Sequence, residues 1–226
     1  MLKKILHQYE SAPGVYSFLN PYTYLMIRKL NFELDGWFID GIIFVWILRV
    51  FGIKTIRTSF DMTSLAKIIF EDANIHANSI AVIGSKQNEL LAFIEILRKK
   101  YPKLNIIYYR NGYFSDDKEK LDAINYLISA KVDYVLVGMG AVHQEDFLCK
   151  LKAAKYAGQA FSCGGFIHQT ARKGMHYYPK WINKLNLRWL YRIKDEPYLA
   201  KRYFIHYPVA VLLLSLDLIK MKKVTH

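Results

Sequence analysis

Cysteine and acidic residues are both scarce in this chain of 226 residues. The two cysteines, Cys149 and Cys163, fit neither a zinc-binding spacing nor a disulfide framework, which favours a reducing compartment. Only 19 acidic residues stand against 32 lysines and arginines, which gives a formal charge of +13. A basic excess of this size calls for an anionic partner: a phosphorylated ligand, a nucleic acid or an anionic membrane surface.

Long apolar runs are missing as well. A membrane-spanning helix needs about 20 apolar residues, whereas the run at 42–48 lies between Asp40 and Arg49 and the run at 209–219 contains Asp217. No signal-peptide apolar region forms near the N-terminus, so we expect a cytoplasmic protein. Because three lysines follow the run at 209–219, two interpretations stay open: a segment lying in a membrane interface, or a helix packed on its own domain.

What the chain does contain is a regular alternation of strand and helix patterns. Its hydrophobic content of 53% indicates a folded protein. Apolar runs predict strands at 15–19, 38–39, 79–83, 105–109, 132–137 and 160–163, and helical spacing predicts helices at 21–30, 42–51, from 58 or 59 onward, 88–100, 118–130 and 146–157. Apolar strands separated by helices indicate a parallel sheet covered on both faces.

This alternation predicts an α/β fold, with a Rossmann-like, mostly parallel sheet and its helices over residues 1–175. Residues 176–226 change in character, because they are basic and rich in aromatic side chains. They predict a C-terminal helical appendage, broken near Glu196 and Pro197 and close to a membrane.

Glycine and polar residues gather where the predicted strands end. They occur at Asp40-Gly41, Gly84-Ser85-Lys86, Asn111-Gly112 and Gly138 to Glu145, and Gly164-Gly165 follows the last strand. Glycine lets backbone approach a ligand, and the amides of a following helix can bind phosphate. Neither a P-loop nor a dinucleotide fingerprint is present. The candidate binding glycines are therefore Gly112, Gly138, Gly140, Gly164 and Gly165.

Asp40 is the sharpest single position, because it separates an apolar strand pattern from an apolar helix pattern. An acid there is either a helix N-cap or a carboxylate that accepts a proton from a hydroxyl. Gln144 can hold sugar hydroxyls, and Glu145 either joins it or only favours the helix start through the helix dipole. No Ser-His-Asp or metal-ligand pattern appears, and Asp116-Asp117 is typical of a solvated helix start, so we expect no metal and no other cofactor.

Arginines form the remaining candidate set. Arg188 and Arg192 are one helical turn apart, and Arg202 lies beyond Pro197. Clustered arginines clamp phosphate groups through paired hydrogen bonds. Arginines on a solvated helix would give the same pattern, so both interpretations stay open.

Taken in order, these residues resemble the WecG/TagA/CpsF family of bacterial glycosyltransferases. The resemblance runs from about residue 17 to 207, and it is carried by the ordered set Asn20-Pro21, Asp40-Gly41-Ile42, Gly52, Arg57, Asp61-Met62, Gly112-Tyr113-Phe114, Val137-Gly138-Met139-Gly140, Gln144-Glu145, Gly164-Gly165-Phe166, Pro179-Lys180-Trp181, Trp189-Leu190-Tyr191-Arg192 and Glu196-Pro197.

The resemblance implies an inverting transferase. Its donor would be a UDP-sugar of the N-acetylmannosamine type, often the uronic acid, and its acceptor an undecaprenyl-diphosphate-linked saccharide at the cytoplasmic membrane face. The products would feed capsule, teichoic acid linkage units or other polysaccharides. By position, Asp40 resembles the base, Asn20 and Gln144 resemble pocket residues, and Arg57 resembles a site cation. Arg192 and Arg202 resemble appendage residues that reach the substrate diphosphates. Whether the protein forms a homo-oligomer stays open.

The chain also departs from the family pattern. Val142-His143 stand where Pro-Lys is common, Tyr177-Tyr178-Pro179 replace Arg-Ala-Pro, and Ile167-His168-Gln169 occupy a stretch where many members have an aspartate. These changes border the expected donor pocket. They therefore leave the identity of the donor sugar open, while the reaction type is less affected.

Two alternatives belong to other classes of protein. A non-catalytic member of the same fold would use the basic face to bind a lipid-linked saccharide or an assembly partner. A nucleic-acid-binding module would explain the basic and aromatic appendage. It would leave the strand-end glycines and Asp40 without a role, so we expect no nucleic acid partner.

Overall fold

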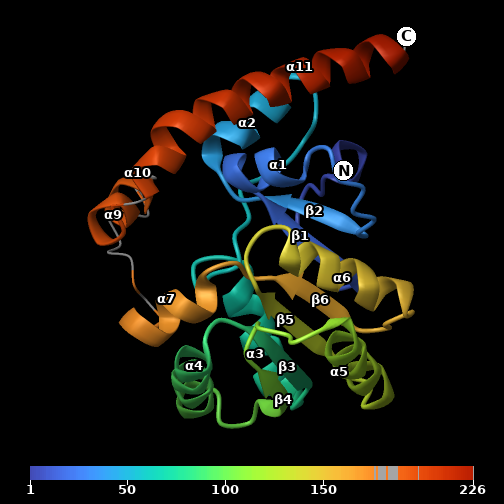
Figure 1. The fold of residues 1–226 in the computed structure, drawn as a ribbon, viewed down its shortest axis with the longest axis vertical. Helices are drawn as coiled ribbons and strands as arrows, with labels where there is room; N and C mark the ends of the chain where they lie inside the picture. The colour runs from blue at the N-terminus through green and yellow to red at the C-terminus, as the bar shows by residue number, and fades with distance from the viewer. Residues whose placement is uncertain (176, 178–181, 183–187, 198, 226) are drawn as a thin grey trace.

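The computed structural model describes residues 1–175, 177, 182, 188–197 and 199–225 (Figure 1). Its centre is a sheet of six parallel strands in the order β2-β1-β6-β5-β3-β4. The strands are β1 (Gly14–Leu19), β2 (Gly36–Ile39), β3 (Ser79–Gly84), β4 (Asn105–Arg110), β5 (Tyr134–Gly138) and β6 (Gln159–Ser162). The predicted α/β fold with a parallel sheet is confirmed.

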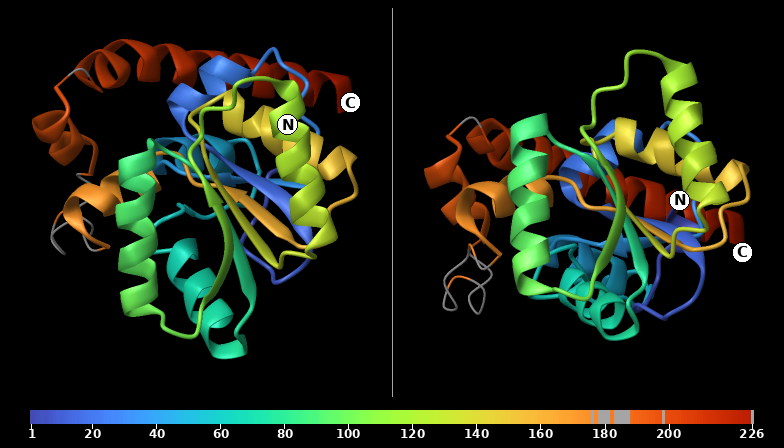
Figure 2. Two further views of the ribbon diagram at one scale, coloured as in Figure 1. Left: turned by 60° about the horizontal axis from the view of Figure 1, so that its bottom comes forward. Right: turned by 90° about the horizontal axis from the view of Figure 1, so that it is seen from below.

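Helices cover both faces of this sheet (Figures 1 and 2). In chain order they are η1 (Leu2–Lys4), α1 (Pro21–Ile27), α2 (Ile42–Val50), α3 (Leu65–His76), α4 (Gln87–Lys100), α5 (Asp117–Ser129), α6 (His143–Ala153), α7 (Phe166–Lys173), α9 (Arg188–Asp195), α10 (Leu199–Lys201), the π-helical η2 (Arg202–His206) and α11 (Tyr207–Thr225). Side chains alternate along each strand, so two separate apolar cores form. One core lies beneath α3, α4 and α7, and the other lies beneath α1, α2, α5, α6 and α11.

The connections leave an opening above the middle of the sheet. Strands β1 and β6 are neighbours, but α1 leaves β1 on one face while α7 leaves β6 on the other. The same reversal separates β5, followed by α6, from β3, followed by α4. In open α/β sheets such switch points at the carboxyl ends of the strands are where ligands bind.

Two helix starts differ from the sequence prediction for local reasons. The helix expected from 58 or 59 begins at Leu65, because Asp61 first closes a turn with Thr63, whose amide donates to Asp61 Oδ1 at 2.8 Å. The helix expected at 146–157 begins at His143, because the Glu145 carboxylate accepts from the Val142 amide at 2.7 Å. Helix α7 was not predicted, although Phe166, Ile167 and Thr170 line up as its buried face.

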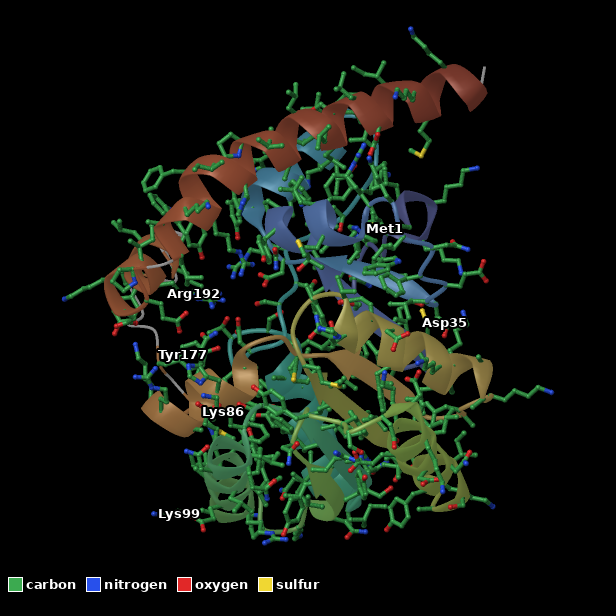
Figure 3. The ribbon with its side chains drawn as sticks, in the orientation of Figure 1. Met1, Asp35, Lys86, Lys99, Tyr177 and Arg192 are labelled. Carbon is green, nitrogen blue, oxygen red and sulfur yellow. The ribbon has the colours of Figure 1, made fainter. Side chains whose placement is uncertain are left out.

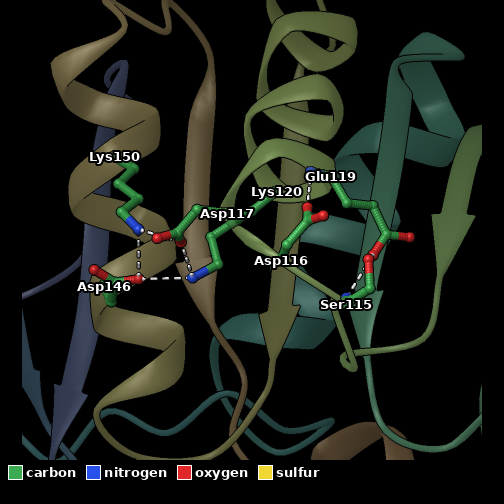
Figure 4. A network of polar contacts seen from close by, with 7 residues as sticks. All are labelled: Ser115, Asp116, Asp117, Glu119, Lys120, Asp146 and Lys150. Carbon is green, nitrogen blue, oxygen red and sulfur yellow. Dashed lines mark hydrogen bonds and ion pairs between the residues drawn. The ribbon is translucent and has the colours of Figure 1, made fainter.

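A surface network of charges fixes the start of α5 against α6 (Figure 4). Lys120 Nζ lies 3.2 Å from Asp117 and 3.1 Å from Asp146, and Lys150 Nζ lies 3.0 Å and 3.3 Å from the same two carboxylates. Asp116 caps α5 by accepting from the Glu119 amide at 2.8 Å. Asp116-Asp117 is thus a solvated helix start, as the sequence indicated.

The C-terminal helix is longer than the apolar run at 209–219 suggested. Helical structure continues from Leu199 to Lys223, long and apolar enough by length and composition to cross a membrane. Pro208 lacks the N–H group of a normal helix position. The preceding π-helical turn accommodates it, because the Tyr207 amide bonds back to the carbonyl of Arg202.

One side of α11 packs on the core, as the second of the two open interpretations required. Ala210, Leu214 and Leu218 are buried in the core that α1 and α2 share. Asp217, which interrupts the apolar run, is paired with Arg28 of the α1 end at 2.9 Å. The domain boundary predicted after residue 175 adjoins residues that the structure does not describe, among them 176 and the family segment 179–181.

Candidate active site

A cleft of about 1400 Å³ runs along the carboxyl edge of the sheet and continues under the C-terminal segment. Residues that follow all six strands contribute to its walls. Asp40, which follows β2, and Gln144, on the first turn of α6, both line it. Asp40 and Gln144, which are far apart in the sequence, therefore share one cavity.

Asp40 lies on the side of the cleft nearest β2. Its side chain is 38% exposed because the cleft opens above it, while protein atoms surround it elsewhere. This burial raises the pKa of the Asp40 carboxyl, and the Arg57 guanidinium opposes the rise, with Nη2 3.9 Å from Oδ1. Gly41, not Asp40, occupies the N-cap position of α2. The carboxylate is thus not used as a helix cap.

Asp61 sits deeper beside the same wall and holds the appendage. Arg188 Nη1 lies 2.6 Å from Asp61 Oδ2, and the two side chains are 13% and 9% exposed. Burial alone would raise the pKa of Asp61, but Arg188 and hydrogen bonds from Thr63 and Ser59 hold it below its usual range. Arg188 therefore lines the cleft as part of an ion pair between α9 and the core.

The other two appendage arginines also reach the cleft. Figure 3 shows Arg192 on the inner side of α9, above Tyr177 and Lys86. Its Nη2 lies 3.9 Å from Glu196 Oε2. Arg202 donates to Asn20 Oδ1 at 3.0 Å and stacks on the Tyr22 ring at 4.3 Å.

Asn20 joins the core to the appendage. Its Oδ1 accepts from the Thr23 amide at 2.9 Å, which makes Asn20 the N-cap of α1, and it also accepts from Arg202. Asn20 lines the cleft as well. A cap residue that faces the cavity thus positions a cation supplied from the far end of the chain.

A model of the glycosyl transferase WecG/TagA/CpsF family matches residues 2–224. The chain belongs to this family. It is also 39% identical, over 86% of its length and 83% of the relative's, to a UDP-Gal:alpha-D-GlcNAc-diphosphoundecaprenol beta-1,4-galactosyltransferase of Shigella boydii. An N-acetylglucosaminyldiphosphoundecaprenol N-acetyl-beta-D-mannosaminyltransferase of Bacillus subtilis is 26% identical, over 58% of this chain and 49% of its own length.

The strand-end glycines of this glycosyltransferase serve two different needs. A Cβ atom at Gly138 would lie 2.9 Å from Ile167 Cδ1 and 3.1 Å from the Gly164 carbonyl, and one at Gly112 would lie 3.2 Å from Gly84 Cα. These two glycines let neighbouring strand ends pack together. Gly140 and Gly164 have φ of +81° and +51°, and apart from the adjacent residues no atom of the described residues lies within 4 Å of the Cβ position, so backbone conformation favours glycine at both. At Gly165 a Cβ would lie 2.9 Å from Nε2 at the end of the Gln169 side chain.

One polar cluster in the cleft was not predicted. His168 Nδ1 lies 2.7 Å from Glu89 Oε1, Ser85 donates to the other oxygen of Glu89, and His168 Nε2 lies 3.9 Å from Glu196. The cluster links β3, α4, α7 and the appendage. Its members are up to 111 positions apart (85 to 196), so no local motif announces it.

Metal ligation was not expected from the sequence, and the described part of the chain contains no group of three or more His, Cys, Asp or Glu side chains placed to hold a metal ion. A reaction without a metal stays a prediction.

Proposed function

We propose that this glycosyltransferase moves a hexose from a UDP-sugar to N-acetylglucosamine linked to undecaprenyl diphosphate, with galactose as the favoured donor sugar. The observation that carries the choice is the 39% identity to the Shigella boydii galactosyltransferase over 86% of the chain. An N-acetylmannosamine-type donor, which the family resemblance implied, is the second candidate, and the Bacillus subtilis relative favours it. The product would enter bacterial polysaccharide biosynthesis, including capsule.

The proposed reaction is a direct displacement with inversion. Asp40 takes the proton from the acceptor hydroxyl as its oxygen attacks the anomeric carbon, and UDP leaves from the opposite side. The raised pKa of Asp40 suits this task, because a more basic carboxylate is a better proton acceptor. Charge that develops on the diphosphate is met by Arg192, Arg202 and backbone amides of the cleft.

A donor screen tests the proposal. Purified protein is given UDP-galactose, UDP-N-acetylglucosamine or UDP-N-acetylmannosamine with a short polyprenyl-diphosphate-N-acetylglucosamine acceptor, and products are read by mass. We expect a mass increase of one hexose with UDP-galactose. An N-acetylhexosamine product would establish the second candidate. Binding of the lipid-linked acceptor without any product would instead support the non-catalytic alternative.

Removing the Arg57 cation is expected to move the acidic limb of the pH profile of kcat/KM to higher pH. Arg57 lowers the pKa of Asp40, so Arg57→Gln lets that pKa rise further, and the base is lost at a higher pH than in the wild type. Lys54→Gln removes one exposed positive charge nearby in the chain and serves as the control. An equal shift in both variants, or none in Arg57→Gln, would contradict the pairing.

The acceptor lipid implies a membrane surface, and we propose that α11 lies on the cytoplasmic face of the membrane rather than crossing it. Its core-facing side is occupied, since Asp217 is paired with Arg28. On its other sides Val209, Leu212, Leu216 and Ile219 are between 42% and 61% exposed. Lysines at its end and Trp46 of the adjoining α2, 59% exposed, add basic and aromatic anchors for an anionic interface.

Charging the exposed side of α11 is expected to weaken membrane binding without unfolding the protein. Leu212→Glu combined with Leu216→Glu removes apolar contact with lipid, which we expect to reduce binding to anionic vesicles by about tenfold or more. Leu121→Glu, at a 50% exposed position on α5, is the matched control. The readout is co-sedimentation with vesicles, and equal binding by the double variant would remove α11 from the interface.

A further inference from the structure

A buried carboxylate lies directly behind the cleft wall. Glu145 is fully buried on α6, and its Oε2 accepts from the Val142 amide at 2.7 Å. Its Oε1 accepts from Ser17 Oγ at 2.8 Å and from Gln144 Nε2 at 2.9 Å. All three neighbours donate, so they fit the ionised carboxylate. Burial raises the pKa of Glu145, and these donors oppose the rise.

The direction of the hydrogen bonds around Ser17 follows from its chemistry. Ser17 has one hydroxyl hydrogen, and it donates this hydrogen in the bond to Glu145 Oε1. Ser162 Oγ lies 2.7 Å from Ser17 Oγ, so Ser162 must be the donor in that second contact. The three residues come from β1, α6 and β6 and form an ordered chain behind the switch point between β1 and β6.

This order fixes the amide of Gln144. Its Nε2 is committed to Glu145, and turning the amide over would place its carbonyl oxygen against the carboxylate, which repels it. Gln144 is 4% exposed and lines the cleft, and within the described part of the chain its Oε1 has no hydrogen-bond partner. A buried oxygen without a partner costs about 1–3 kcal/mol, so Gln144 Oε1 is an unmet hydrogen-bond acceptor in the wall of the cleft.

Backbone strain marks the same turn. Val142 has φ of +77°, which a β-branched residue rarely adopts. Glu145 Oε2 accepts from the backbone N–H of Val142, and the backbone N–H of Gln144 donates to the Gly140 carbonyl at 3.1 Å. Strain of this kind persists where surrounding contacts impose it, and it concentrates at ligand sites. Glu145 therefore holds both the turn at Val142 and the side-chain amide of Gln144, which belong to the wall of the cleft.

We propose that Glu145 is a positioning residue that locks Gln144 with its carbonyl oxygen toward a hydroxyl of the sugar substrates, so that the cleft selects a substrate carrying a polar hydrogen at that point. The inference rests on the proposed function and narrows it. A substrate that has a carboxylate or a plain methylene at that point leaves Gln144 Oε1 unpaired, and the enzyme discriminates against it.

Deoxy substrates test this selection. Wild type, Gln144→Met and Glu145→Gln are assayed with UDP-galactose, its 2-, 3-, 4- and 6-deoxy analogues, and acceptors with 3- or 6-deoxy-N-acetylglucosamine. We expect one deoxy position to lower kcat/KM of the wild type by about 10- to 100-fold and to have little further effect in Gln144→Met. In Glu145→Gln the amide is free to turn over, so the same discrimination falls while transfer of the natural sugar persists. Glu95→Gln, at an exposed position on α4, is the control.

A purely structural role for Glu145 would give a different result. Glu145→Gln would then lower thermal stability and slow all substrates equally, with discrimination unchanged, and that outcome overturns the proposal. So does a wild type in which no deoxy position is coupled to Gln144→Met.

The amide lock can be tested separately from transfer. In 15N-labelled protein the side-chain NH2 signal of Gln144, assigned by its absence in Gln144→Met, is expected to exchange slowly with solvent and to change in Glu145→Gln. If no UDP-sugar is transferred but this signal behaves as expected, the proposed function fails while the lock stands. A Gln144 amide that exchanges like those of exposed glutamines refutes the lock itself.

Discussion

Replacing Asp40 by asparagine is expected to lower kcat for sugar transfer by about 100-fold or more, with little change in the affinity for UDP. Asparagine keeps the shape of the side chain but accepts no proton, so the acceptor hydroxyl must attack without a base. The nucleotide is held by other parts of the cleft, and its binding is measured by calorimetry. Transfer is measured by product mass with UDP-galactose and the lipid-linked acceptor.

The matched control is Glu71→Gln, which neutralises an acid at an exposed position on α3. It is expected to leave both transfer and UDP binding as in the wild type. Turnover of Asp40→Asn within a few-fold of wild type would refute the base role. Loss of UDP binding together with turnover would show that Asp40 serves nucleotide binding instead.

The sheet and the cleft at its carboxyl edge could be predicted because the signals are local. Apolar runs that end in glycine and polar residues mark the carboxyl ends of parallel strands, and these ends must meet at one edge. The sequence alone therefore indicates that Asp40 and Gln144 share one cleft. The N-cap role of Asn20 can be inferred from the sequence in the same way, because Pro21 follows it.

The remainder depends on contacts between distant residues. The sequence around Glu145 does not reveal that Ser17 Oγ lies 2.8 Å from Glu145 Oε1. The pattern at Glu145 therefore fits an ordinary residue at a helix start as well as it fits a site residue. The sequence predicts that ligands approach the strand-end glycines, and it does not reveal that Gly138 also packs closely against Ile167 and Gly164. The apolar run at 209–219 predicts too short a C-terminal helix, because helical structure extends from Leu199 to Lys223 and the π turn before Pro208 accommodates that proline.

Arg188 illustrates the same limit, because an arginine that contacts phosphate and one that pairs with a buried acid have the same sequence signature. In the structure Arg188 joins α9 to Asp61 on the core. Its side chain lines the cleft while it does so. The pairing predicts that α9 moves away from the cleft wall when one charge of the pair is removed and the other stays buried.

Replacing Arg188 by methionine is therefore expected to release the appendage. Leaving a buried charge without its partner costs about 3–5 kcal/mol, and the chain can avoid this cost by moving α9 away so that water reaches Asp61. We expect faster hydrogen exchange and proteolysis at α9 and a large loss of transfer, with little change in the exchange of the sheet. The double variant Arg188→Met with Asp61→Asn removes both charges and should recover much of the protection of α9.

Acid provides an independent check on this pair. Because the folded protein holds the pKa of Asp61 below its ordinary value of 3.8, the pair contributes its full stability above that pH and loses it as the pH falls through the lowered pKa. Wild-type α9 should thus stay protected down to the ordinary carboxylate range and open only in stronger acid. The Arg188→Met variant should be open at neutral pH already. Equal protection of α9 in both proteins at neutral pH would show that other contacts hold the appendage.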